Sequence, residues 1–149
     1  MSVRAVIVIP ARLKSTRLPG KPLVDLLGTP MVIRTWQQCR QAMPDSDIYI
    51  ATDSPDIKEV CDRYGAQTLM TSEGCLTGTD RVAEVAKQID ADIYINVQGD
   101  EPVFPVEDLN RFILEARSKP DQVLNGICPI TEESEYRSAS IPKVVATSS

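Results

Sequence analysis

The most informative stretch of this chain is Ile93-Tyr94-Ile95-Asn96-Val97-Gln98-Gly99-Asp100-Glu101-Pro102, in which an apolar run leads into a loop with two carboxylates. An apolar run of this kind predicts a buried strand of a parallel sheet. Open α/β sheets bind ligands just beyond the carboxyl ends of their strands. A carboxylate there can hold Mg²⁺, which takes oxygen ligands and bridges to substrate phosphates. The alternative is an acidic turn that only ends a strand.

A basic stretch near the N-terminus, Ile9-Pro10-Ala11-Arg12-Leu13-Lys14-Ser15-Thr16-Arg17-Leu18-Pro19-Gly20-Lys21-Pro22, follows a strand expected over residues 3–9. It has neither helical nor alternating periodicity, so it predicts a loop. Arginine forks match phosphate oxygens, and lysine supplies point charge. A solvated basic loop is the alternative. Its place after the first strand of an otherwise acidic chain favours a polyphosphate ligand, and the two loops together predict a metal–nucleotide site.

Strand and helix patterns alternate along the chain. Strands are expected at residues 3–9, 47–52, 67–70, 92–97, 123–130 and 143–147. Helices are expected between them, one of them over the apolar stripe from Val106 to Ala116. This alternation of strands and helices predicts a three-layer α/β fold, in which a mostly parallel sheet is covered by helices on both faces. Right-handed crossovers would bring the loops after residues 9, 52 and 97 to one edge.

Capping residues predict where three of these helices begin. Thr29-Pro30 and Ser54-Pro55 each place a cap residue before a first-turn proline, and Gly65 is the expected end of the second helix. Thr79 or Asp80 can cap the third.

Composition narrows the function. The chain has 149 residues, which suits one domain, and its net charge of −5 argues against nucleic acid as a partner. No apolar run is long enough for a bilayer and no signal peptide is visible, so a cytoplasmic protein without a membrane partner is expected. The absence of histidine excludes Ser-His-Asp or Cys-His chemistry within these residues. Cys39 and Cys61 lie on apolar helical stripes, which favours core packing over a disulfide or zinc site.

The two loops and three shorter motifs also carry a family resemblance. The shorter motifs are Ala51-Thr52-Asp53, Thr71-Ser72 and Gly78-Thr79-Asp80-Arg81. Together these motifs resemble the bacterial sugar cytidylyltransferases, and within them the 3-deoxy-manno-octulosonate (Kdo) cytidylyltransferase family. The resemblance implies a nucleotide-diphospho-sugar transferase-like, Rossmann-like fold. The chain departs from the family at Cys75-Leu76-Thr77 and Ser140-Ile141-Pro142, which leaves amino-Kdo or a sialic-acid-like sugar open as the acceptor.

The resemblance implies that CMP is transferred from CTP to an acidic 3-deoxy sugar, with release of pyrophosphate, for lipopolysaccharide precursor synthesis. The implied roles are neutralisation of the triphosphate, metal binding, and contacts to cytosine and sugar. By resemblance, the triphosphate residues are Arg12 and Lys21, with Ala11, Ser15 and Arg17 as further substrate contacts; Asp100 is the Mg²⁺ ligand; Thr71, Ser72 and Arg81 line the cytosine pocket; and Gln98 faces the sugar. For Arg81, a surface cation at a helix start is the alternative.

Two other functions stay open: a CTP-binding domain without turnover, and a nucleotidylyltransferase that acts on a sugar or alditol phosphate. Family members continue beyond the point that corresponds to Ser149. We therefore expect residues 1–149 to form one nucleotide-binding domain that is truncated at its C-terminal end, in an enzyme that forms homodimers through the part that follows.

Overall fold

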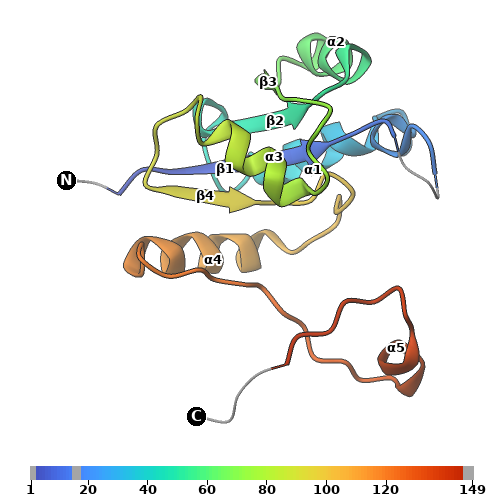
Figure 1. Ribbon diagram of the computed structural model, residues 1–149, viewed down its shortest axis with the longest axis vertical. Helices are drawn as coiled ribbons and strands as arrows, with labels where there is room; N and C mark the ends of the chain where they lie inside the picture. Colours follow the sequence, from blue (N-terminus) through green and yellow to red (C-terminus); the bar gives the residue numbers. More distant parts are fainter. Residues whose placement is uncertain (1–2, 15–17, 146–149) are drawn as a thin grey trace.

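A parallel sheet with the strand order β3-β2-β1-β4 forms the centre of the structure, a computed structural model that describes residues 3–14 and 18–145 (Figure 1). The strands are β1 (Ala5–Ala11), β2 (Ile48–Thr52), β3 (Thr68–Met70) and β4 (Ile93–Asn96). All three pairings between neighbouring strands are parallel, as predicted.

The helices follow the strands in the predicted alternation. They are α1 (Met31–Cys39), α2 (Pro55–Tyr64), α3 (Gly78–Val85), α4 (Val106–Ser118) and α5 (Glu133–Arg137), with short 3₁₀ turns η1 (Lys21–Leu23) and η2 (Asp45–Asp47).

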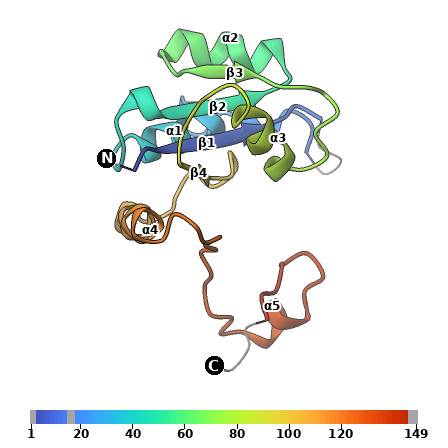
Figure 2. The same cartoon turned by 60° about the vertical axis from the view of Figure 1, so that its left-hand side comes forward.

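The core lies on both faces of β1, which is buried along its whole length. Because strand side chains alternate, Ile7 and Ile9 face one cluster, which also contains apolar residues of α1, α2 and α4. Val6 and Val8 face a second cluster, to which α3 contributes Val85. In Figure 2, α1 and α3 lie on opposite sides of the sheet. The predicted three-layer architecture is therefore confirmed.

The direction in which successive strands are added to the sheet reverses next to β1. The chain moves outward from β1 to β2 and β3, and α3 then carries it back across the sheet to β4 on the other side of β1. The loops that follow β1 and β4 therefore diverge, and such a topological switch point is where open α/β sheets bind ligands. The first strand is also shifted from the prediction: it ends at Ala11 rather than at residue 9, so Pro10 and Ala11 belong to β1.

The second helix has the predicted ends. The Ser54 side chain accepts a hydrogen bond from the Ile57 amide at 3.3 Å, and Gly65 ends the helix in a left-handed conformation with φ of 75°. These two predictions are confirmed.

The predicted starts of two other helices are wrong. Helix α3 is capped by Thr77, because its extended backbone leaves the hydroxyl free to accept from the Asp80 amide, while the Asp80 carboxylate accepts from the Thr77 amide. Asp80 is thus the partner in a capping box rather than the cap. For α1, Pro30 itself occupies the N-cap position, and none of the described side chains caps the helix.

The two C-terminal strands are also absent from the described residues. The backbone of residues 123–130 and 143–145 forms no strand, and residues 146–147 lie outside the described part of the chain. A strand needs a neighbour to complete its hydrogen bonds, but after α4 the chain leads away from the sheet toward α5 (Figures 1 and 2). The apolar pattern there remains in solvent, with Val123 and Ile127 exposed at 92% and 63%.

The predicted core role of two cysteines is confirmed. Cys39 and Cys61 are fully buried, and burial raises the pKa of their thiols to about 12 and about 11. All four cysteines are free, and Cys128 is exposed. Among the described residues, no helix combines the length and apolar character needed to cross a bilayer.

Candidate nucleotide site

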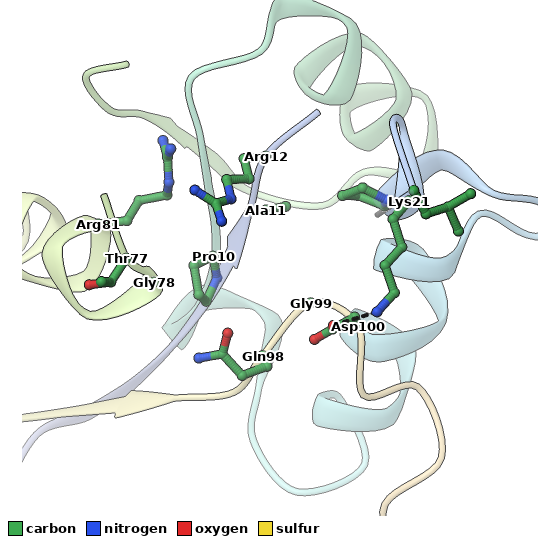
Figure 3. Close-up of a pocket in the computed structure, with 12 residues that line it drawn as sticks. Pro10, Ala11, Arg12, Lys21, Thr77, Gly78, Arg81, Gln98, Gly99 and Asp100 are labelled. Atoms are coloured by element: carbon green, nitrogen blue, oxygen red, sulfur yellow. Dashed lines mark hydrogen bonds and ion pairs between the residues drawn. The ribbon is translucent and has the colours of Figure 1, made fainter. Parts of the chain in front are cut away.

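A pocket of about 510 Å³ opens at the switch point, between the carboxyl ends of β1 and β4 and the start of α3 (Figure 3). The residues that line it are Pro10, Ala11, Arg12, Leu18, Lys21, Pro22, Thr77, Gly78, Arg81, Gln98, Gly99 and Asp100.

The basic loop after β1 forms one wall of the pocket. Gly20 has φ of 71°, which favours glycine, and its amide donates to the Leu13 carbonyl at 3.0 Å. This hydrogen bond closes the loop and places Lys21 at the start of η1, beside the pocket. At the end of β1, the Arg12 guanidinium donates to the Leu76 carbonyl at 3.2 Å, which ties the loop to the segment before α3.

The loop after β4 forms the opposite wall. Its Asp100 carboxylate accepts from Lys21, with 2.6 Å between Nζ and Oδ2. The two side chains are 38% and 47% exposed, so ligands can reach both. In Figure 3 the pair lies at one side of the pocket, and Gln98 lies nearer to β4 on the same loop. The Gln98 amide donates to the Asn96 side chain at 2.9 Å, which orients it at the pocket floor.

Arg81 is buried rather than exposed. Only 2% of it is accessible, its guanidinium donates to the Thr71 hydroxyl, and its Nη2 lies 3.3 Å from Oδ1 of Asp53. That oxygen is buried without a well-aligned hydrogen bond, so its interaction with Arg81 is mainly ionic. The alternative of a surface cation is therefore wrong for Arg81. Asp53 had no predicted role, although it belongs to the Ala51-Thr52-Asp53 motif.

Ser72 is held by a second residue of α3. Both its amide and its hydroxyl donate to the Glu84 carboxylate, the amide at 2.7 Å. These hydrogen bonds favour the charged form and lower the pKa of Glu84 to about 2. Arg81 and Glu84, three positions apart on α3, thus fix Thr71 and Ser72 respectively. Neither Thr71 nor Ser72 lines the pocket itself.

The structure brings most of the predicted site residues to one place. Those that line the pocket are Ala11, Arg12, Lys21, Arg81, Gln98 and Asp100. Thr71 contacts this group through Arg81, and Ser72 follows it in the chain. Lys14, another cation of the loop, is exposed and pairs with Glu73 at 2.9 Å, which raises the pKa of Lys14. Ser15 and Arg17 lie outside the described residues.

The lining residues without a predicted role are Pro10, Leu18, Pro22, Thr77, Gly78 and Gly99. A Cβ on Gly78 would lie 3.0 Å from the Pro10 ring and 3.2 Å from the Gln98 amide, so a side chain there would crowd the pocket floor. The Thr-x-x-Asp spacing of Thr77 and Asp80 is a capping-box pattern, and it could have located this helix start from the sequence.

The described side chains of this site suit a divalent metal that is bound together with a substrate. Within the described ranges, no three acidic, cysteine or histidine side chains cluster in a way that could hold a metal ion. Asp100 is the carboxylate on the pocket wall. Mg²⁺ is commonly held by one or two carboxylates, with substrate phosphates and water completing its shell. The donor set is therefore suited to a metal that arrives with phosphate ligands.

Among the described residues that line the pocket, Arg12, Lys21 and Arg81 are cationic and Asp100 is acidic, in a chain whose net charge is −5. Arg81 is already paired with Asp53, so Arg12 and Lys21 are the cations of these that lack a buried counter-charge. Its charge and its place at the switch point suit a polyanionic ligand. The fold is that of the Rossmann-like nucleotidyltransferases. The chain belongs to the cytidylyltransferase family, which it matches over residues 6–148.

Named relatives agree with the resemblance seen in the motifs. A 3-deoxy-manno-octulosonate cytidylyltransferase from Chloroherpeton thalassium is 51% identical over 112 residues, which are 75% of this chain and 46% of that protein. One from Francisella philomiragia is 45% identical and covers 93% of this chain and 57% of its own length. The chain spans about half the length of the curated relatives it matches.

Solved structures show the same fold. A CMP:2-keto-3-deoxy-manno-octonic acid synthetase complexed with CTP superposes with a TM-score of 0.75 at 41% identity, and the match covers 78% of this chain and 48% of that one. A cytidylyltransferase from Leptospira borgpetersenii, with a TM-score of 0.67 and 22% identity over 76% of this chain and 48% of its own, shares the fold.

Proposed function

We propose that residues 1–149 carry the CTP-binding part of a cytidylyltransferase that joins CMP to Kdo and releases pyrophosphate. One observation carries the proposal: the described residues that line the pocket at the switch point of the sheet include the cations Arg12, Lys21 and Arg81 together with the carboxylate of Asp100. The names of the relatives and the CTP complex of the similar structure support cytidine as the base and Kdo as the acceptor. Kdo activation would serve lipopolysaccharide precursor synthesis in the cytoplasm, in a homodimer.

In the proposed reaction, the anomeric hydroxyl of the sugar attacks the α-phosphorus of CTP. A new O–P bond forms, the bond to the β-phosphate oxygen breaks, and pyrophosphate leaves with the electron pair while the hydroxyl proton is released. Such a transfer depends mainly on positioning and on charge neutralisation. A chain without histidine can supply both, because cations and hydrogen-bond donors are sufficient.

The described residues would have different roles in this reaction. Lys21 and Arg12 reach the pocket from the loop after β1, where they would neutralise the phosphates. Arg81 is held in place by Thr71 and Asp53, so it would meet the nucleotide without reorganisation. Gln98 lies at the pocket floor on the β4 side, where it would contact the sugar.

Asp100 is the residue that would hold Mg²⁺. When bound, the metal would polarise the phosphoryl oxygens and neutralise part of their charge. In the structure this carboxylate pairs with Lys21. Binding of the metal nucleotide would exchange this ion pair for two others, Lys21 with phosphate and Asp100 with metal.

The proposal is tested first by nucleotide binding to the 149-residue chain. Isothermal titration with CTP, UTP, ATP and GTP, each with and without Mg²⁺, should show binding that requires the metal and favours CTP. Absence of binding, or equal affinity for all four nucleotides, would contradict the assignment of the pocket.

The acceptor is tested on the full gene product that contains these residues. Pyrophosphate release is measured with CTP and each of Kdo, amino-Kdo, sialic acid and a sugar phosphate. Kdo should give the highest kcat/KM. A preference for the sugar phosphate would place the protein among nucleotidylyltransferases of the same fold that use phosphate acceptors, and CTP binding without release of pyrophosphate for any acceptor would identify a binding domain.

A further inference from the structure

The loop that carries Asp100 accepts a hydrogen bond from a buried hydroxyl group in another layer of the fold. Thr35 lies on α1 and is fully buried. Its Oγ1 lies 3.1 Å from the Gly99 carbonyl oxygen, to which it donates, and 3.3 Å from the Met31 carbonyl of its own helix. The contact to Gly99 spans 64 positions of the chain and joins α1 to the loop after β4.

The hydroxyl would be satisfied without this contact. A threonine inside a helix can donate to the carbonyl four residues earlier, which here is that of Met31. The shorter contact is nevertheless the one to Gly99. Valine has nearly the same shape and would fill the same space, so packing alone does not require a hydroxyl at position 35.

Gly99 is fixed on its other side by β1. A Cβ at this position would lie 2.8 Å from the Pro10 carbonyl oxygen, so the loop backbone packs directly against the end of the strand. The backbone of Gly99 is therefore held between Pro10 and Thr35. The next residue is Asp100, whose carboxylate faces the pocket and meets Lys21 (Figure 3).

We propose that Thr35 is a positioning residue for Asp100: its hydroxyl fixes the Gly99 carbonyl and thereby sets where the Asp100 carboxylate meets the metal nucleotide. The inference rests on the proposed function, and it extends that function to a residue that does not touch the ligand. A neutral hydrogen bond of this kind corresponds to roughly a fivefold change in an equilibrium constant. That change should appear in the metal dependence of nucleotide binding.

The test measures the Mg²⁺ concentration that gives half-maximal CTP binding to the full gene product that contains these residues. Thr35→Val should raise this concentration about fivefold. Thr35→Ser keeps a hydroxyl at the same position and should restore the value of the unmodified chain. Thermal unfolding of each variant establishes that it is folded, and Thr35→Ala replaces the valine variant if the latter does not fold.

Gln38 provides a matched control. It lies one turn further along α1 and also tethers the segment after β4, since its amide donates to the Phe104 carbonyl at 2.7 Å. Gln38→Ala removes a contact between the same helix and the same segment, but at a point beyond Asp100. It should leave the metal dependence of CTP binding unchanged even where it lowers the unfolding temperature.

A second measurement separates positioning from general stability. In the Asp100→Asn background, where the metal ligand is gone, Thr35→Val should have no further effect on CTP affinity. The inference is overturned if Thr35→Val and Thr35→Ser have the same metal dependence, if Gln38→Ala shifts it as much as Thr35→Val does, or if the two effects add in the double variant. Failure of the unmodified chain to bind CTP with Mg²⁺ would instead overturn the proposed function.

Discussion

The side chains of Lys21 and Asp100 meet at 2.6 Å across the mouth of the pocket and join the loops that follow β1 and β4. Both are more than one third exposed, and ion pairs in such surroundings contribute roughly 0–1 kcal/mol to stability. The pair is therefore easily separated. Once the pair is separated, Lys21 could bind the triphosphate and Asp100 could bind its metal.

The first prediction concerns the metal ligand. Asp100→Asn should abolish the Mg²⁺ dependence of CTP binding, because an amide is a much poorer ligand for Mg²⁺ than a carboxylate. Without metal, the variant should bind CTP at least as tightly as the unmodified chain, since Lys21 no longer has an internal partner. Glu101→Gln, at the neighbouring exposed carboxylate, is the control and should titrate like the unmodified chain. Unchanged metal dependence in Asp100→Asn would remove this residue from the site.

The second prediction concerns the triphosphate. Lys21→Ala and Arg12→Ala should each cost about 2–4 kcal/mol in kcat/KM for CTP, by analogy with removal of one preorganised donor. Steady-state kinetics of the full gene product measure this loss. Lys58→Ala removes the same charge from α2, where Lys58 pairs with Asp62 at 2.7 Å, and should leave the kinetics unchanged. If the pocket variants and Lys58→Ala behave alike, net charge rather than the pocket determines affinity.

The central sheet and the start of α2 were predictable because their signals are local. An apolar run such as that of β1 predicts a buried strand, and a cap residue with proline predicts the start of α2. The predicted strand at residues 123–130 failed because strand formation depends on a neighbour, which local sequence does not specify.

Contacts between distant residues could not be predicted from sequence patterns for the same reason. Asp53 follows β2, whereas Arg81 lies on α3, and only the folded sheet brings their side chains together. In the sequence, Thr35 is likewise an ordinary position of an amphipathic helix. Its contact with Gly99 forms only when α1 packs against the loop after β4.

The third prediction concerns the buried ion pair. Asp53→Asn should lower the free energy of unfolding by about 3–5 kcal/mol, because it leaves the buried Arg81 without its counter-charge. Urea unfolding followed by circular dichroism measures the change. Asp62→Asn breaks an exposed pair on α2 and should cost less than about 1 kcal/mol. A loss as small as that for Asp53→Asn would show that water screens the Arg81 site.

The fourth prediction concerns pH. The pKa of Glu84 is lowered from 4.5 to about 2 in the folded chain by its hydrogen bonds from Ser72. A lowered folded-state pKa stabilises the fold at pH values above the unfolded-state pKa, and this contribution is lost as the pH falls toward the folded-state pKa. The difference in unfolding temperature between the unmodified chain and Glu84→Gln should therefore shrink from pH 5 to about pH 2.

Ser72→Ala tests the cause of this pH effect. It removes the hydroxyl that contributes most to the lowered pKa of Glu84, so it should reduce the same pH dependence without changing a charge. Differential scanning calorimetry across this pH range measures all three proteins. A difference between the unmodified chain and Glu84→Gln that stays constant with pH would mean that Glu84 titrates alike in the folded and unfolded states.

The last prediction concerns the backbone at Gly99. An alanine there would place its Cβ 2.8 Å from the Pro10 carbonyl oxygen, an atom of the central strand that cannot move without disturbing the pairing of β1 with β2. Overpacking of this kind costs about 1–3 kcal/mol. The displaced loop would also carry Asp100 away from Lys21, so Gly99→Ala should weaken metal-dependent CTP binding as well as stability.

Gly126 supplies the matched control for that substitution. No described residue lies within 4 Å of a Cβ at Gly126, and its φ is not in the left-handed region. Gly126→Ala should therefore be neutral or stabilise the chain by up to about 1 kcal/mol through the unfolded state. Urea unfolding and CTP titration of both variants decide the matter. If Gly99→Ala resembles Gly126→Ala in both measurements, the loop has room to shift, and the close packing of Gly99 against Pro10 does not fix the position of Asp100.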